Sequence, residues 1–229
     1  MSVERVTNYV DKLEPYLTPD SGNFDDVRPA LMSLVLPYEV DPWRYFHTVK
    51  HLEEKLEFLV AHAEEFDHPR VVFGASPGHD TLYYPWLYNP QLGVKGINEA
   101  QSSEMTQRLF TPHFKLWEVS KMGQFIEVTA HHPSDLGNTD LGYFLDSDMR
   151  IIGAPPERFE EYEGQTSSEF TWLGTVARKQ YLMGRLAFFA SVKGKLIYNT
   201  DAGRDLYQAQ ADTNITDMTA RHTAELERL

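Results

Sequence analysis

Apolar residues recur at helical spacing along most of this chain, and few segments show the strict alternation that half-buried strands require. Between residues 2 and 16 they stand at the spacing of an amphipathic helix, at Val3, Val6, Tyr9, Val10 and Leu13. The same pattern predicts helices over residues 25–36, 98–110, 114–131, 140–152, 156–167, 172–191 and 202–229. The sequence therefore predicts an all-α fold.

One further helix has a recognisable start, with Asp41 as the N-cap candidate and Pro42 at the first helical position. We expect it to run to about Glu65 with a buried face formed by Val49, Leu52, Leu56, Leu59 and Val60. Residues 70–76 are apolar but too few for periodicity to distinguish a strand from a buried helix. Residues 18–22 and 81–97 have the composition of loops.

The composition is that of a globular protein, with 229 residues of which 41% are hydrophobic and 24% charged. The chain has no cysteine, which excludes disulfides and thiolate metal sites and leaves His, Asp and Glu as metal ligands. The apolar runs are too short to cross a bilayer, and no secretory signal is visible at the N-terminus. A cytoplasmic location is therefore expected.

The formal net charge of −13 bears on the partners of the protein. Such a surface repels nucleic acid and anionic lipid, and Arg178-Lys179 is the densest basic pair. We therefore expect neither a nucleic acid polymer nor a membrane as a partner. An acidic protein that handles small phosphorylated molecules needs cations in its site, and a bound metal ion is one way to supply them.

Histidines and aspartates stand in three separated segments. His47 and His51 have i, i+4 spacing, which places two imidazoles on one face of the expected helix. His79-Asp80 follows, and Asp146-Ser147-Asp148 stands beside apolar residues much later. Imidazole nitrogen and carboxylate oxygen together suit one divalent ion, with Zn, Mn, Fe, Ni or Mg as candidates.

In four segments the sequence resembles the predicted metal-dependent phosphohydrolases of the HD superfamily. Their patterns are Arg-x-Tyr-His-x-x-x-His, His-Asp-x-x-Tyr-Asp-Pro, Asn-Glu-x-x-Ser-Ala and Asp-Ala-Asp-Leu-x-Ile-Leu-Gly, and they correspond to residues 44–51, 79–85, 98–103 and 146–153. The resemblance covers roughly residues 44–200 and is most specific over 146–153. It implies a single HD-like helical bundle over residues 1–229, with a core at roughly 40–200 and terminal helices packed on it.

The resemblance also implies a ligand set for one divalent ion. The ligands would be His51, His79, Asp80 and one of Asp146 or Asp148, and Asp148 is preferred because it directly precedes the Leu-like residue, here Met149. The implied activity is hydrolysis of a small phosphorylated molecule, with nucleotides among the candidates. A homo-oligomer is compatible with this prediction.

Catalytic and substrate-binding residues follow from the same resemblance. His47 matches the position of a general acid, since an imidazole with a pKa near 6.5 can protonate a leaving group at neutral pH. The ion lowers the pKa of water, and Asp80 or Asp148 orients the resulting hydroxide. Arg44 and His132 are predicted to contact the substrate phosphate, although Arg44 in an interhelical salt bridge and His132 at a solvated helix end are equally good interpretations.

The sequence departs from the family pattern at two places. Ser76-Pro77-Gly78 precedes His79 and is expected to break or kink that helix. Tyr84 stands where the family has an aspartate. These departures leave open a non-catalytic HD-like metal-binding module, and a two-iron oxygenase using His131 and His132 is a further alternative.

A rival motif overlaps the same segment. Residues 74–78 read Gly-Ala-Ser-Pro-Gly and satisfy Gly-x-Ser-x-Gly, the nucleophile elbow of α/β-hydrolase esterases, with Ser76 as the nucleophile. That elbow requires a strand, a tight turn that exposes the serine, and then a helix. The esterase alternative therefore depends on a strand before Ser76.

Overall fold

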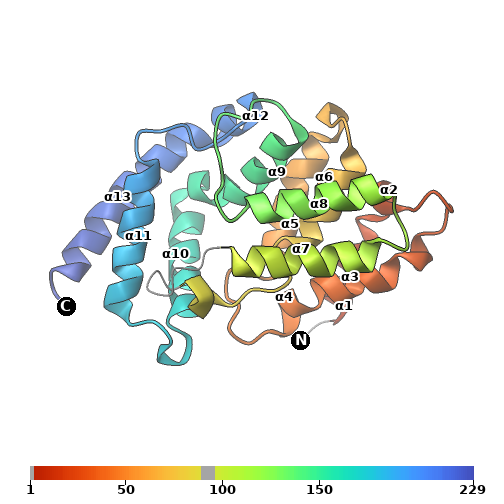
Figure 1. The fold of residues 1–229 in the computed structure, drawn as a ribbon. Helices are drawn as coiled ribbons and strands as arrows, with labels where there is room; N and C mark the ends of the chain where they lie inside the picture. Colours follow the sequence, from red (N-terminus) through yellow and green to blue (C-terminus); the bar gives the residue numbers. More distant parts are fainter. Residues whose placement is uncertain (1–2, 89–95) are drawn as a thin grey trace.

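The computed structural model describes residues 3–88 and 96–229, and every regular element in these two ranges is a helix (Figure 1). The prediction of an all-α fold is confirmed. The longer helices are α1 (Val3–Asp11), α3 (Arg28–Val35), α5 (Val49–Ala61), α6 (Pro69–Gly78), α7 (Ile97–Phe110), α8 (Leu116–Val128), α9 (Asp140–Met149), α10 (Pro156–Phe170), α11 (Arg178–Val192) and α13 (Ala209–Leu226). Shorter ones include α2 (Glu14–Leu17), α4 (Pro37–Val40), η3 (Pro85–Tyr88), η5 (Arg150–Gly153), α12 (Asp201–Gly203) and η7 (Arg204–Gln208).

The buried apolar residues form two clusters. The larger, here called the N-terminal cluster, contains the buried faces of α1, α3, α5, α6, α8 and α9. The smaller, the C-terminal cluster, is formed by Phe46 with residues of η5, α10, α11 and α13. Figure 1 shows α10, α11 and α13 grouped at one end of the molecule. None of the described helices is long and apolar enough to cross a membrane.

Several expected helices are divided into shorter pieces. The helix predicted over residues 2–16 is interrupted at Lys12 and Leu13, and Pro15 stands in the first turn of α2. Residues 140–152 form α9 and then η5, and residues 202–229 include a π-helical stretch before α13. The expected loop over 81–97 contains η3, and its residues 89–95 lie outside the described ranges.

The predicted helix start at Asp41 is wrong, because α5 begins only at Val49. The side chain of Glu169, at the end of α10, is the physical reason. Its Oε1 accepts hydrogen bonds from the backbone N–H groups of Tyr45, Phe46 and His47 at 2.8, 2.8 and 2.9 Å. A carboxylate that holds three successive N–H groups competes with the helical arrangement of that segment. The predicted burial of Val60 is also wrong, since it is 45% exposed.

The segment before His79 remains helical. Residues 70–76 lie in α6, which includes Pro77 and ends at Gly78, so the helix is not broken at Pro77 but stops directly before His79. Ser76 is fully buried inside this helix, and no strand precedes it in the described part of the chain. The geometry of a nucleophile elbow is therefore not present at Ser76.

The close packing of α6 against α7 and α8 predicts a stability effect at Gly78. A Cβ at this position would meet Thr106 Oγ1 at 2.2 Å and Ile126 Cδ1 at 3.0 Å. We expect Gly78→Ala to lower the free energy of unfolding by about 1–3 kcal/mol, as overpacking does. Gly164 in α10 is the matched control because a Cβ there meets nothing within 4 Å, so Gly164→Ala should stabilise by about 0.5–1 kcal/mol. Urea unfolding midpoints measure both, and equal effects would contradict the packing argument.

Candidate metal centre

Four of the residues that the sequence predicts as metal ligands lie together. His51 is on α5, His79 and Asp80 directly follow α6, and Asp148 is in the last turn of α9. One ligand atom from each lies within 4.8 Å of all the others. Three segments far apart in the sequence therefore place two imidazoles and two carboxylates around one point.

The ligand atoms face one another at short range. His51 Nε2 lies 3.1 Å from His79 Nε2 and 3.1 Å from Asp148 Oδ1. His79 Nε2 lies 3.0 Å from Asp80 Oδ2 and 3.3 Å from Asp148 Oδ1. Two imidazole nitrogens in contact, with carboxylate oxygens beside them, are the donor set that a borderline divalent ion prefers.

The protonation of the two imidazoles fits a metal site. His79 Nδ1 donates a hydrogen bond to the Ser76 carbonyl at 2.7 Å, which leaves Nε2 as the ligand atom. Burial lowers the pKa of His51 to about 4, so its ring is neutral at pH 7. Burial also lowers the pKa of His79, but the carboxylates of Asp80 and Asp148 more than offset this and raise it to about 9. A divalent ion would replace that proton on binding.

Lys55 is a buried cation that the sequence analysis missed. It lies one turn after His51 on α5, with its Nζ 3.2 Å from Asp148 Oδ1 and 4.6 Å from the centre of the Phe144 ring. Its side chain is fully buried, and burial lowers its pKa. The i, i+4 spacing from His51 was the available signal. A lysine at this spacing is more often solvated, so the pattern alone does not identify it.

His47 lies beside the cluster, directly before α5. Its Nδ1 is 2.7 Å from Glu169 Oε2, and its Nε2 is 3.9 Å from Asp80 Oδ2. Burial lowers the pKa of His47, but the Glu169 carboxylate more than offsets this, so the pKa is raised. Glu169 also accepts a hydrogen bond from the Tyr83 hydroxyl at 3.0 Å. Sequence reasoning missed Glu169, because a glutamate near a helix end carries no signal of its own.

The two predicted substrate-binding residues are placed differently. The guanidinium of Arg44 is fully buried, pairs with Asp41 at 3.0 Å and donates to the backbone carbonyls of Asp80 and Thr81 at 2.8 and 2.9 Å. These contacts tie the segment before α5 to the end of α6. His132 lies at the site, with Nε2 2.9 Å from Asp148 Oδ2. Contact of either residue with a phosphate stays a prediction.

Asp146 and Asp148 face different surroundings. Asp146 is fully buried and accepts hydrogen bonds from the backbone N–H groups of Asn199 and Thr200 at 2.7 and 2.8 Å and from the Thr200 hydroxyl at 2.7 Å. Its oxygens thus anchor the segment before α12, whereas Asp148 points into the cluster. His131 is exposed and is not among the clustered ligands, so the described residues bring His132 alone of that pair to the site.

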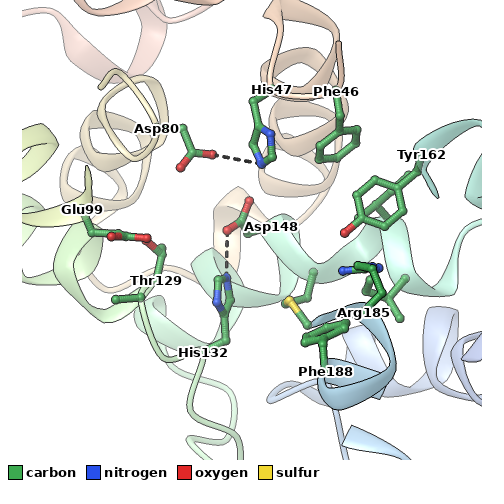
Figure 2. A pocket seen from close by; sticks show the side chains of 14 residues that line it. Phe46, His47, Asp80, Glu99, Thr129, His132, Asp148, Tyr162, Arg185 and Phe188 are labelled. Carbon is green, nitrogen blue, oxygen red and sulfur yellow. Dashed lines mark hydrogen bonds and ion pairs between the residues drawn. The ribbon is translucent and has the colours of Figure 1, made fainter. Parts of the chain in front are cut away.

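The cluster opens on a pocket of about 250 Å³ (Figure 2). His47, Asp80, His132 and Asp148 line one side of it. Apolar side chains of the C-terminal cluster and Arg185 line the other side. A small molecule in this pocket would contact both the candidate metal ligands and His47.

Comparisons with protein-family models, curated proteins and solved structures found no match to this chain. The case for the site therefore rests on its own geometry and on the motifs.

The different surroundings of the two aspartates predict different effects of the same substitution. We expect Asp148→Asn to abolish binding of Zn²⁺ or Mn²⁺. Asp146→Asn should retain the metal but lose about 1–3 kcal/mol of stability, because the N–H and O–H groups that donate to the Asp146 carboxylate would then face an amide. At a hundredfold excess over Kd, a bound ion should stabilise the wild type and Asp146→Asn by about 2.7 kcal/mol. Elemental analysis measures the metal content of each variant, and thermal melts with and without metal measure the stabilisation. Metal retained by Asp148→Asn would contradict the assignment.

Proposed function

We propose that this protein is a divalent-metal-dependent phosphohydrolase of the HD kind that acts on a small phosphorylated molecule, with nucleotides among the candidates. The observation that carries the proposal is the convergence of His51, His79, Asp80 and Asp148, of which Asp80 and Asp148 line a pocket. The motifs of residues 44–51, 79–85 and 146–153 support the same family. The net charge of −13 supports a small molecule as the substrate in preference to a nucleic acid polymer or a membrane.

Residues of the chain itself would position and protonate the substrate. When bound, a divalent ion supplies a Lewis acid that polarises a phosphoryl oxygen and lowers the pKa of water. The Asp80 carboxylate is one of the four clustered ligands, also lines the pocket and can orient the attacking water. Glu169 holds Nδ1 of His47, so the Nε2 side of the ring faces the pocket and can protonate the leaving oxygen.

A non-catalytic metal-binding module is the second candidate. The motifs favour it through two departures from the family pattern, Ser76-Pro77-Gly78 before His79 and Tyr84 in place of an aspartate. In the structure α6 continues through Pro77, and His79 lies 3.1 Å from His51 between their Nε2 atoms. This geometry retains the metal ligands that both candidates need, and the position of His47 beside Asp80 in the pocket lining favours the catalytic proposal.

The separate positions of His47 and His51 predict different effects of the two alanine variants. We expect His47→Ala to keep its metal and to lower kcat by roughly 10²–10⁴-fold, because general acid catalysis is lost. The loss should be smaller for nitrophenyl phosphate, whose leaving group needs little protonation. His51→Ala should lose metal and activity together for every substrate. The measurements are the metal content of each variant and its kcat on substrates with good and with poor leaving groups. Equal, small effects of both substitutions would mean that neither histidine takes part in catalysis or metal binding.

A second test separates the proposed activity from the esterase alternative. A chelator should abolish phosphatase activity, whereas Ser76→Ala should retain it, because Ser76 is buried within α6. Hydrolysis that persists in chelator and disappears in Ser76→Ala would overturn the proposal.

A further inference from the structure

The wall of the pocket opposite the metal ligands has a chemistry of its own. It is rich in aromatic side chains, and Figure 2 shows Phe46, Tyr162 and Phe188 together with Arg185 on that side, away from Asp80 and His132. Met149 and Ile152 complete the wall. The three rings come from three segments: the turn before α5, the middle of α10 and the second half of α11.

These aromatic residues contact one another and Arg185 within the pocket lining, and Glu169 holds Phe46 from outside it. The rings of Phe46 and Tyr162 meet edge to face with centroids 4.6 Å apart. Phe46 is held through its backbone N–H by Glu169 at 2.8 Å. The Arg185 guanidinium carbon lies 5.4 Å from the Tyr162 centroid and 4.8 Å from that of Phe188. This end of the pocket is therefore a preformed surface for a flat apolar group.

The charge at this end argues against a second anionic group. Among the described residues that line the pocket, Arg185 is the one lysine or arginine. Its Nε donates to Glu163 Oε2 at 3.3 Å, and its Nη2 also pairs with Glu163. His222 Nε2 contacts the same carboxylate at 3.0 Å. Because Glu163 balances the positive charge of Arg185, a polyphosphate chain would find no uncompensated cation here.

The volume of the pocket is consistent with a small substrate. At about 250 Å³ it is smaller than the roughly 300–1,000 Å³ typical of sites for drug-sized ligands. A single phosphate with one ring is compatible with this volume.

We infer that the substrate is a monophosphate ester of a small apolar, ring-bearing alcohol, with its ring on Phe46, Tyr162 and Phe188 and its phosphate at the metal ligands. This inference rests on the proposed function, since the metal centre holds the phosphate. A ring placed beside Arg185 also gains a cation–π contact.

Benzyl phosphate and ethyl phosphate test this directly, because both release an alkoxide and differ in the ring. We expect kcat/KM for benzyl phosphate to exceed that for ethyl phosphate by about tenfold, the order expected for one aromatic contact. Phe188→Ala should remove most of this preference. Met183→Ala is the matched control, because Met183 is on the same helix, 55% exposed and not part of the pocket lining. If Phe188→Ala fails to fold, Phe188→Leu takes its place and should also lower the ratio.

Calorimetry separates failure of this inference from failure of the proposed function. Benzylphosphonate should bind the Zn²⁺-loaded wild type about tenfold more tightly than ethylphosphonate, and the difference should vanish in Phe188→Ala. If no phosphate ester is hydrolysed, the proposed function fails, and this binding difference alone decides the inference. Equal binding of the two phosphonates, an unchanged ratio in Phe188→Ala, or faster hydrolysis of tripolyphosphate than of benzyl phosphate would overturn it.

Discussion

The carboxylate of Asp148 is the group on which the arrangement of this site depends. Its two oxygens contact His51, His79, Lys55 and His132 at 2.9–3.3 Å. Burial alone would raise the pKa of Asp148, but Lys55 and His79 more than offset this and hold it well below its usual range. A buried carboxylate costs several kcal/mol unless partners surround it. The need to surround Asp148 with partners therefore holds α5 and the end of α6 close to α9. Because His51 and His79 are among those partners, the same contacts bring the candidate ligand atoms together.

Glu169 links the candidate metal centre to α10 and the C-terminal cluster. It lies at the end of α10, yet it fixes the backbone of residues 45–47 and the Nδ1 atom of His47. Phe46 belongs to the C-terminal cluster, while His51, a few residues later, belongs to the candidate metal centre. The pocket consequently lies between the candidate metal ligands and the C-terminal cluster, with ionisable groups on one side and rings on the other. A ligand in the pocket would contact both candidate metal ligands and side chains of the C-terminal cluster.

The resemblance of short segments to HD-superfamily motifs predicted that His51, His79, Asp80 and one of two aspartates share one site, and the structure brings His51, His79, Asp80 and Asp148 together. The sequence also predicted most helices, since their apolar periodicity is local. It failed where a distant group decides the local structure. Asp41 and Pro42 have the local signals of a helix start, but Glu169, more than 120 residues away, binds the N–H groups that follow. Pro77 is a second case in which distant contacts decide the local structure. Proline disfavours a helix interior, but the packing of α6 against its neighbours keeps this segment helical. Lys55 was missed because its burial follows from Asp148, which is distant in sequence.

The lysine and arginine side chains near the pocket form ion pairs with carboxylates of the protein, which leaves little positive charge to attract a phosphate. Lys55 is buried against Asp148, and Arg185 is balanced by Glu163. The guanidinium of Arg44 is occupied by Asp41 and by backbone carbonyls. A phosphate approaching a protein of net charge −13 therefore meets no uncompensated lysine or arginine among the described residues that line the pocket. In the proposed function, attraction of the phosphate and activation of water depend on the same divalent ion. Removing the ion should then weaken substrate binding as well as turnover, which distinguishes this site from one in which arginines hold the phosphate and a metal acts only in the chemical step.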